Sequence, residues 1–342
     1  MLPNKLDYKM PAEWTKHERT FVAWPVQDSM CYPEDYEQVV KGYYVELVKA
    51  IAEFESVTVI VNSNELEQVK HYFSEDNIEL LPIAHNDAWI RDNGPTFLIN
   101  DEGQVAGINW KFNAWGGKYA PWDLDDQVAP TILDHLGVKR FDAPLVMEGG
   151  SIHVDGEGTV ITTEECLLNP NRNKDMTKRE IEDNLKQYLN IEKVIWLKQG
   201  LSGDETDGHV DNIACFAAPG KVLIQVCDDP NDENYAITQE NLEILKNTTD
   251  AKGRKLDIIP IEQPPFAEFD GSRLTLSYLN FYFVNGGIIL PIFGGHAEKT
   301  DQMAEKVLSS VYPERKIRKI NGMSIIKEGG NVHCTTQQMP KI

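Results

Sequence analysis

Residues 279–290 read Leu279-Asn-Phe-Tyr-Phe-Val-Asn-Gly-Gly-Ile-Ile-Leu290, two apolar runs joined by an Asn-Gly-Gly turn. Apolar, β-branched runs on both sides of such a turn are typical of a β-hairpin. Three earlier stretches follow the same pattern: residues 95–108, 151–162 and 210–226. The turn glycines of the four stretches recur at intervals of roughly 60 residues, a period typical of repeat folds; they are Gly103, Gly158, Gly220 and Gly286. A chain of 342 residues has room for about five such units.

The fifth unit is predicted to join the two ends of the chain. A strand at Thr20–Trp24 would pair with a C-terminal strand at Asn331–Thr335 and close a ring. Helical patterns lie between the hairpins: the apolar spacing of Tyr36–Phe54, the capping box Thr177-Lys-Arg-Glu180, and the stretch Thr300–Val311. We therefore expect a ring of αβ repeats around a central channel, with an ordinary α/β domain as the alternative.

The composition excludes several classes of partner. Lys+Arg 33 against Asp+Glu 54 gives a net charge of −21, which repels nucleic-acid phosphates and anionic lipid. No apolar run reaches the ~20 residues of a spanning helix, and the first residues do not resemble a secretory signal. Five cysteines without a C-x-x-C pair fit neither a disulfide framework nor a thiolate zinc site. We expect a cytoplasmic protein with free thiols and no nucleic-acid or membrane partner.

Polar clusters containing glycine precede four of the predicted strands, at residues 87–95, 147–153, 204–211 and 327–338. Glycine lets another backbone or a ligand approach closely. Equivalent positions in a ring of repeats converge on its axis, which would gather Asp92, Glu148, His209, Asp211 and Cys334. Cys334 alone among the cysteines lies in a polar setting, so it is the candidate nucleophile, although a lone cysteine is more often structural.

A competing hypothesis rests on three His-x-Asp pairs, His85/Asp87, His153/Asp155 and His209/Asp211. Residues two apart lie on one face of a strand, so three pairs could build the metal site of a hydrolase. Asp155 also falls in an Asp-Gly-Glu-Gly turn, which explains it without a metal.

At these segments the sequence resembles the agmatine deiminases of the guanidino-group modifying (pentein) superfamily. The match extends from Met10-Pro-Ala-Glu-Trp14 to Gln337-Gln338. The motifs that carry it, in the family's order, are Trp89-Ile-Arg-Asp-Asn-Gly-Pro95, Asn113-Ala-Trp-Gly-Gly117, Glu148-Gly-Gly-Ser-Ile-His153, Gly208-His-Val-Asp211 and Gly329-Gly-Asn-Val-His-Cys-Thr-Thr-Gln-Gln338. The resemblance implies one α/β domain over residues 1–342, a five-bladed α/β propeller of pseudo-symmetric ββαβ units. It also implies a homo-oligomer.

The activity implied by the resemblance is hydrolysis of agmatine to N-carbamoylputrescine and ammonia, a step of polyamine biosynthesis, with no cofactor or metal. Carried over by motif, Cys334 matches the nucleophile, His209 the general acid/base and Glu148 the carboxylate that orients the histidine. Asp92 and Asp211 match the pair that grips the guanidinium. Two carboxylates can hold a guanidinium in bidentate fashion, and a thiolate then attacks its carbon to form a covalent thiouronium.

The substrate's tail distinguishes agmatine from arginine. An arginine site should offer an Arg to clamp the carboxylate, and the motifs contain few arginines apart from Arg91. An acidic group at Glu205 with an aromatic wall at Trp89, and Trp115 nearby, would suit a substrate with two positive charges. An arginine or peptidylarginine deiminase and a metal-dependent hydrolase are the alternatives.

Overall fold

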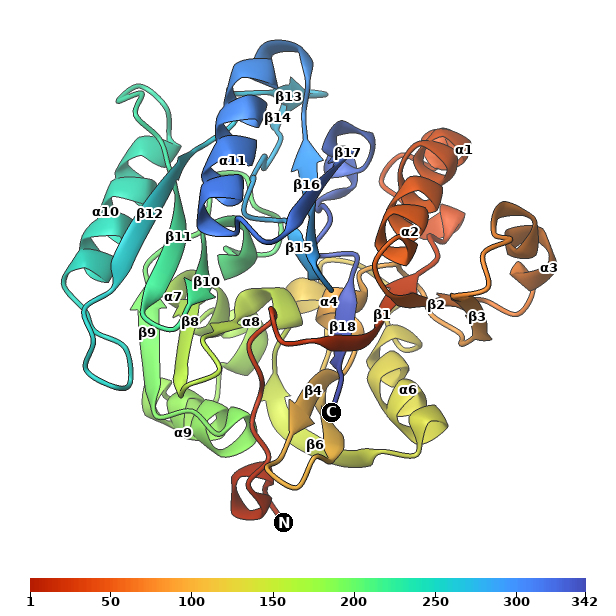
Figure 1. Ribbon diagram of the computed structural model, residues 1–342, viewed down its shortest axis with the longest axis horizontal. Helices are drawn as coiled ribbons and strands as arrows, with labels where there is room; N and C mark the ends of the chain where they lie inside the picture. Colours follow the sequence, from red (N-terminus) through yellow and green to blue (C-terminus); the bar gives the residue numbers. More distant parts are fainter.

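The computed structural model covers residues 1–342 and contains four three-stranded sheets, one four-stranded sheet and one short hairpin (Figure 1). Each three-stranded sheet has an antiparallel pair, then a helix, then a strand parallel to the second. The ββαβ units are β4 (Thr96–Ile99), β5 (Val105–Lys111), α6 (Val128–Leu136) and β6 (Lys139–Val146); β7 (His153–Val154), β8 (Thr159–Thr163), α9 (Lys178–Leu189) and β9 (Lys193–Leu197); β10 (Ala214–Ala218), β11 (Lys221–Val226), α10 (Asn234–Lys246) and β12 (Asp257–Glu262); and β15 (Tyr282–Val284), β16 (Gly287–Ile292), α11 (Glu298–Val311) and β17 (Lys316–Asn321).

The fifth unit joins the two ends of the chain, as predicted. The C-terminal β18 (Gln337–Pro340) pairs antiparallel with β1 (His17–Ala23), and β1 pairs parallel with β2 (Ser56–Val61) after α2 (Val45–Ala52). A further strand, β3 (Ile78–Pro82), extends this sheet beyond β2. The five ββαβ units confirm the predicted pseudo-symmetric propeller.

The predicted C-terminal strand at Asn331–Thr335 is wrong. These residues form a turn, and the strand begins at Gln337. The hydroxyl of Thr335 donates to the carbonyl of Asn331, and that of Thr336 donates to the carbonyl of Val332. These side-chain bonds stabilise a compact turn in place of a strand ladder, and Cys334 lies within it.

The turn glycines have the backbone that the hairpins require. All four glycines of the repeated pattern have positive φ, between 74° and 103°, a region that glycine enters without a steric cost.

The predicted helices are also present. Thr177 and Glu180 form the capping box of α9. Tyr36–Ala52 is helical throughout, as α1 (Tyr36–Val39), a π-helical turn (Val40–Tyr44) and α2.

Figure 1 shows the long helices α2, α6, α9, α10 and α11 on the outside of the ring, with the strands nearer its centre. Apolar side chains fill the space between each helix and its sheet in four buried clusters. Short elements complete the chain: α3 (Leu66–Val69), α4 (Ile90–Asn93), α5 (Ala114–Gly117), α7 (Glu164–Leu167), α8 (Pro170–Asn173) and the hairpin β13 (Glu268–Phe269)–β14 (Ser272–Arg273). None of the helices has the length and hydropathy needed to cross a bilayer.

Candidate functional site

Each blade presents a buried polar side chain from the segment just before its first strand. The five are Asp92 before β4, Glu148 before β7, Asp211 before β10, Asn280 before β15 and Cys334 before β18. His209 comes from the same segment as Asp211 and is fully buried. The convergence predicted from the repeats is therefore present, and it includes Asn280, which the sequence did not single out.

Gly150 lies where three of these side chains meet. A Cβ added to it would lie 2.6 Å from His209 Nδ1, 2.9 Å from Asp211 Oδ2 and 3.0 Å from Asp92 Oδ1. Carbon atoms do not approach polar atoms so closely without displacing them, so only glycine fits here. The Gly-Gly of the Glu148 segment thus allows a histidine and two carboxylates to approach one point.

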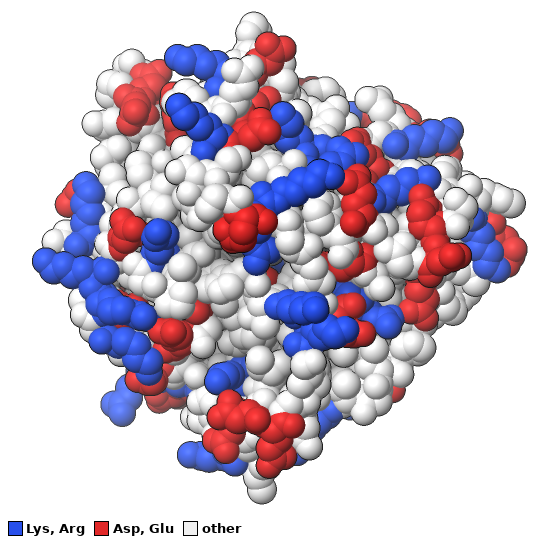
Figure 2. Space-filling view, viewed as in Figure 1, with Lys and Arg blue, Asp and Glu red and all other residues white.

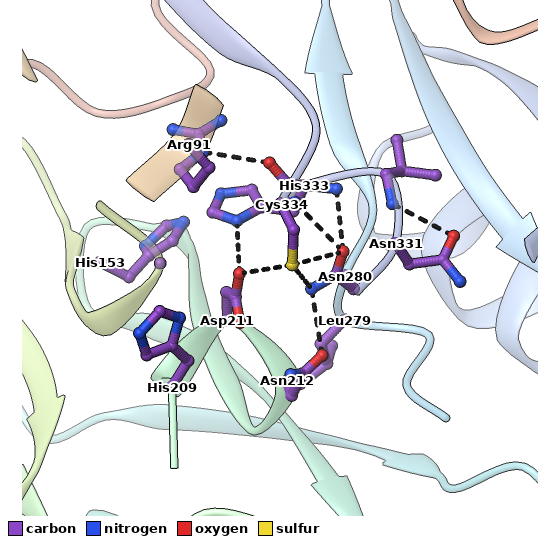
Figure 3. Close-up of polar contacts among 12 residues, drawn as sticks. Arg91, His153, His209, Asp211, Asn212, Leu279, Asn280, Asn331, His333 and Cys334 are labelled. Carbon is purple, nitrogen blue, oxygen red and sulfur yellow. Dashed lines mark hydrogen bonds and ion pairs between the residues drawn. The ribbon is translucent and has the colours of Figure 1, made fainter. Parts of the chain in front are cut away.

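The thiol of Cys334 contacts two of the converging groups (Figure 3). It donates to Asp211 Oδ2 at 3.4 Å and accepts from Asn280 Nδ2 at 3.1 Å. Asn280 is held in turn, because Nδ2 also donates to Asn212 Oδ1 at 3.0 Å and Oδ1 accepts from the His333 amide at 2.9 Å. Burial, together with the carboxylates of Asp211 and Asp92, raises the pKa of Cys334 well above its ordinary value, so the thiol is protonated when no cation is bound.

The two aspartates face the site differently. Asp92 accepts from Trp115 Nε1 at 2.9 Å through Oδ2 and from the Gly150 amide at 3.0 Å through Oδ1, yet burial holds its pKa above the ordinary range. Burial also acts on Asp211, but the hydrogen bond from His333 outweighs it and the pKa is lowered. Asp211 Oδ1 is buried and has no hydrogen-bond partner, so it is an open acceptor.

His209 lies between two carboxylates at ion-pair distances. Nδ1 is 3.8 Å from Asp92 Oδ1, and Nε2 is 3.7 Å from Glu148 Oε2. Burial lowers the pKa of His209, but Asp92, Cys166 and Glu148 outweigh burial and raise the pKa well above its ordinary value. The histidine is therefore protonated at neutral pH, which suits a group that gives a proton to a leaving nitrogen.

Glu148 is held by a buried arginine that the sequence gave no reason to select. Arg172 Nε donates to Glu148 Oε1 at 2.6 Å, and its other nitrogens donate to Asp207 Oδ2 at 2.8 Å and to the Thr206 carbonyl at 2.9 Å. Burial raises the pKa of Glu148, but His209 and Arg172 outweigh burial, so the pKa is lowered. Glu148 is thus ionised and fixed in orientation beside His209.

Arg172→Met is expected to destabilise the fold by about 3 kcal/mol, because it leaves the buried Glu148 carboxylate without its cation. Urea unfolding measures the change. Arg179→Met is the matched control. Arg179 is exposed on α9, and its ion pair with Asp183 is long, at 4.0 Å. Exposed pairs of this kind contribute little to stability. Equal unfolding midpoints for Arg172→Met and the unmodified protein would contradict the prediction.

A pocket opens onto Cys334 and Asp92. Trp89, Trp115 and Tyr119 lie along its wall, and no Lys or Arg lines it. Four acids do: Asp87, Asp92, Glu205 and Glu328. Glu205 is exposed, and its Oε2 accepts from the Tyr119 hydroxyl. His209, Glu148 and Asp211 lie behind the pocket lining rather than in it.

Trp115 has an unusual backbone. Its φ is 54° and that of Ala114 is 51°, in the left-handed region that side chains other than glycine, asparagine and aspartate rarely enter. Asn113 Oδ1 accepts from the Gly116 amide and closes this turn. The turn aims the indole at Asp92, so backbone strain here coincides with a contact to the site.

The three His-x-Asp pairs do not build a metal site together. His85 bonds the carbonyls of Ile83 and Trp24, and Asp155 Oδ1 accepts from backbone amides of its own turn. The only group of three His, Cys, Asp or Glu side chains whose ligand atoms all lie within 4.8 Å of one another is Glu148, Cys166 and His209. That group contains one member of the three pairs.

On the face shown in Figure 2, acidic and basic side chains are interspersed. The net charge of −21 is therefore not gathered into one acidic patch on this face. The acids that line the pocket are a separate, local feature.

The sequence of the chain matches one family model over residues 9–340, that of the Porphyromonas-type peptidyl-arginine deiminases. Because the match spans nearly the whole chain, the protein belongs to this family, and within it to the agmatine deiminases. The agmatine deiminase of Ectopseudomonas mendocina is 45% identical over an alignment of 364 residues that covers 99% of this chain and 97% of the relative.

Solved structures agree with this assignment. The agmatine deiminase of Enterococcus faecalis has a TM-score of 0.94 at 37% identity, covering 99% of this chain and 98% of that chain. A dimethylarginine dimethylaminohydrolase has a TM-score of 0.53 at 14% identity, covering 94% of this chain and 100% of that chain, which is a likeness of fold alone. The pentein propeller expected from the motifs is thus confirmed.

Proposed function

We propose that this protein is an agmatine deiminase, a hydrolase that converts agmatine and water to N-carbamoylputrescine and ammonia. The observation that carries the proposal is the meeting of His209, Asp92 and Asp211 at Gly150, with Cys334 hydrogen-bonded to Asp211. Such a set suits a planar cation attacked by sulfur, because paired carboxylates bind a guanidinium and a thiol supplies the nucleophile. The family relationship supports the same reaction.

Substrate binding would activate the cysteine. The guanidinium would bind between Asp92 and Asp211, with the unpartnered Oδ1 of Asp211 accepting one of its N–H groups. These same carboxylates raise the pKa of the Cys334 thiol, so a cation bound to them favours the thiolate. Asn280 Nδ2, at 3.1 Å, then donates to a sulfur that carries negative charge.

The reaction would proceed in two halves. Sγ of Cys334 attacks the guanidinium carbon to form a tetrahedral intermediate, His209 gives a proton to a terminal nitrogen, and ammonia leaves a covalent thiouronium. His209, now neutral, takes a proton from water as the water oxygen attacks the same carbon. The C–S bond breaks with its electron pair returning to Sγ of Cys334, the hydroxyl proton restores the thiol, and N-carbamoylputrescine departs. Glu148, ionised and fixed by Arg172, keeps His209 oriented through both halves.

Glu205→Gln is expected to raise the KM for agmatine by about fivefold with a smaller change in kcat, because an exposed ion pair to the ammonium tail contributes about 1 kcal/mol to binding. Steady-state ammonia release measures both constants. Glu233→Gln, at an exposed glutamate outside the pocket lining, is the control. An unchanged KM for Glu205→Gln would place the ammonium group at another acid of the pocket.

Ammonia release from agmatine and from arginine, with and without chelator and iodoacetamide, tests the proposed function. Agmatine turnover that survives chelator and is lost on alkylation is the expected result. Turnover of arginine in preference to agmatine would overturn the substrate assignment, and loss of activity on chelation would overturn the cysteine mechanism.

Three proposals about context accompany this function. We propose that residues 1–342 act as one domain, which the pairing of β1 with β18 supports. We propose a cytoplasmic location, which the five free cysteines support. Self-association is proposed from the family resemblance, and analytical ultracentrifugation tests it.

A further inference from the structure

A buried histidine other than His209 lies behind the site, next to the nucleophile in the chain. His333 Nδ1 is 3.0 Å from Asp211 Oδ2, and His333 Nε2 is 2.8 Å from Glu13 Oε1. All three side chains are at least 97% buried. Figure 3 shows the ring of His333 directed at Asp211, on the side of that carboxylate away from Asn212. Glu13 belongs to the N-terminal Met10–Trp14 motif, which has no other role in the reaction described above.

The hydrogen bonds define the protonation state of His333. A neutral imidazole carries one N–H and would present a lone pair to one of the two carboxylates. Both nitrogens are within hydrogen-bonding distance of a carboxyl oxygen, and the pKa values of Glu13 and Asp211 are both lowered. With both acids ionised, both nitrogens donate, which requires an imidazolium. The row Glu13–His333–Asp211 is thus a cation between two anions.

Other side chains fix Glu13 at the far end of this row. His153 Nδ1 accepts from the Phe216 amide at 3.1 Å, so its proton is on Nε2, which is 3.5 Å from Glu13 Oε2. Arg91 NH1 is 3.5 Å from Glu13 Oε1, and Arg91 Nε donates to the His333 carbonyl at 3.2 Å. The Glu13 carbonyl accepts from His17 Nε2 at 2.8 Å. Glu13 therefore cannot turn away from His333.

We propose that Glu13 and His333 are positioning residues: the buried imidazolium of His333, held by Glu13, keeps Asp211 ionised and aims its free Oδ1 at the substrate guanidinium. This inference rests on the proposed function for its role in substrate binding. His333 bonds only one of the two oxygens of Asp211, and the other is buried and unpartnered. A carboxylate held by one oxygen has its second oxygen in a defined place before substrate arrives.

The charges around the row agree with this arrangement. Burial and the charge of Arg91 lower the pKa of His333, but Glu13 and Asp211 outweigh them and the pKa is raised. The pKa of Glu13 is well below its ordinary value, because His333, His153 and Arg91 outweigh its burial. The other titratable groups around Asp211 are Cys334, His209, Asp92, Asp204 and Cys215. Burial raises the pKa of Asp92, because its histidine, His209, lies 3.8 Å away and makes no hydrogen bond to it.

Glu13→Gln tests the proposal, since it keeps the shape and an acceptor oxygen but removes the charge that holds His333 protonated. The imidazolium would then be lost as the pH rises through neutrality, and Asp211 would face a lone pair. We expect the KM for agmatine to rise about tenfold or more at pH 8 and to change much less at pH 6. In the unmodified protein Glu13 and Asp211 raise the pKa of His333, so we expect this pH dependence to be much weaker.

Glu55→Gln is the matched control. Glu55 is also a buried glutamate that accepts from a buried histidine, His17, at 2.9 Å, but it makes no contact with Asp211 or Cys334. It is expected to lower stability without a pH-dependent change in KM. A loss of activity in Glu13→Gln that is equal at pH 6 and pH 8 would overturn the proposal, because a purely structural role predicts that result.

A nitrogen-15 NMR titration of the histidines in the unmodified protein tests the charge state without relying on turnover or on the folding of a variant. His333 is expected to show two protonated ring nitrogens from pH 6 to pH 8, with His333→Gln assigning the signal. A singly protonated ring at pH 7 would overturn the inference whatever the substrate. A doubly protonated ring in a protein without agmatine turnover would instead leave the imidazolium established and overturn the proposed function.

Discussion

Cys334→Ser is expected to lower agmatine turnover by at least about 10³-fold. A serine hydroxyl is a far weaker nucleophile than a thiolate, and neither Asp92 nor Asp211 would make it ionise. Ammonia release measures the loss. The fold should be unaffected, because the Asn280 amide that donates to sulfur at 3.1 Å can donate to an oxygen as well.

Cys227→Ser is the matched control, since this cysteine is free and lies outside the site. It should keep turnover within about twofold of the unmodified protein, as expected for a substitution that touches no catalytic group. Mass spectrometry of acid-quenched enzyme should show the thiouronium adduct on the peptide containing Cys334 and on no other. Near-normal turnover by Cys334→Ser would show that the covalent mechanism is wrong.

His209→Ala is expected to lower kcat by about 10²- to 10⁴-fold, the range for loss of a general acid/base. Leaving ammonia needs a proton in the first half-reaction, and water needs a base in the second, so both halves slow. His135→Ala, at an exposed position on α6, is the control.

The pH profile separates loss of the proton donor from a structural defect. The pKa of His209 is raised because Asp92, Cys166 and Glu148 outweigh its burial, so the group is protonated through neutrality and loses its proton as the pH rises through that raised value. Acid catalysis therefore weakens on the alkaline side in the unmodified protein, and this limb should be missing from His209→Ala. If the residual activity of His209→Ala still fell on the alkaline side as in the unmodified protein, a group other than His209 would be responsible for that fall.

The repeat could be predicted because each blade contains the same local signal. Each repeat has a turn glycine with positive φ, at Gly103, Gly158, Gly220 and Gly286. The regular spacing of these glycines can be read from the sequence without knowing how the blades pack. The convergence of Asp92, Glu148, Asp211 and Cys334 followed from the same period, since equivalent positions of a ring face one axis. The same argument placed His209 beside them, since it lies in the 204–211 segment with Asp211.

Asn280 was missed although it occupies the equivalent position in its blade. It lies within an otherwise apolar stretch, 279–290, where a single amide resembles an ordinary polar residue of a strand end. Comparing the residue before each hairpin across all five units, rather than looking for charged clusters, would have found it.

Arg172, His333 and Glu13 could not be found in this way. Their contacts join segments that are far apart in the chain, such as α8 with Glu148 and the N-terminal motif with the C-terminal turn. Cys166 is another example: it is buried like a core thiol, but its sulfur lies 3.9 Å from Glu148 Oε2. Such pairings depend on how the blades pack around the axis, and the spacing of residues within one segment does not predict that packing.

The pairing of β1 with β18 has a consequence for the order in which activity arises. Cys334 lies in the turn that immediately precedes β18, so the nucleophile is delivered by the strand that closes the ring. During synthesis β1–β3 and then the four internal blades emerge before β18, and each internal blade is a continuous stretch of chain that can form its own local hairpin. The nascent protein can thus acquire most of its sheets and all its substrate-binding carboxylates while it is still without catalytic power. The sulfur of Cys334 reaches the carboxylates of Asp92 and Asp211 only when β18 pairs with β1.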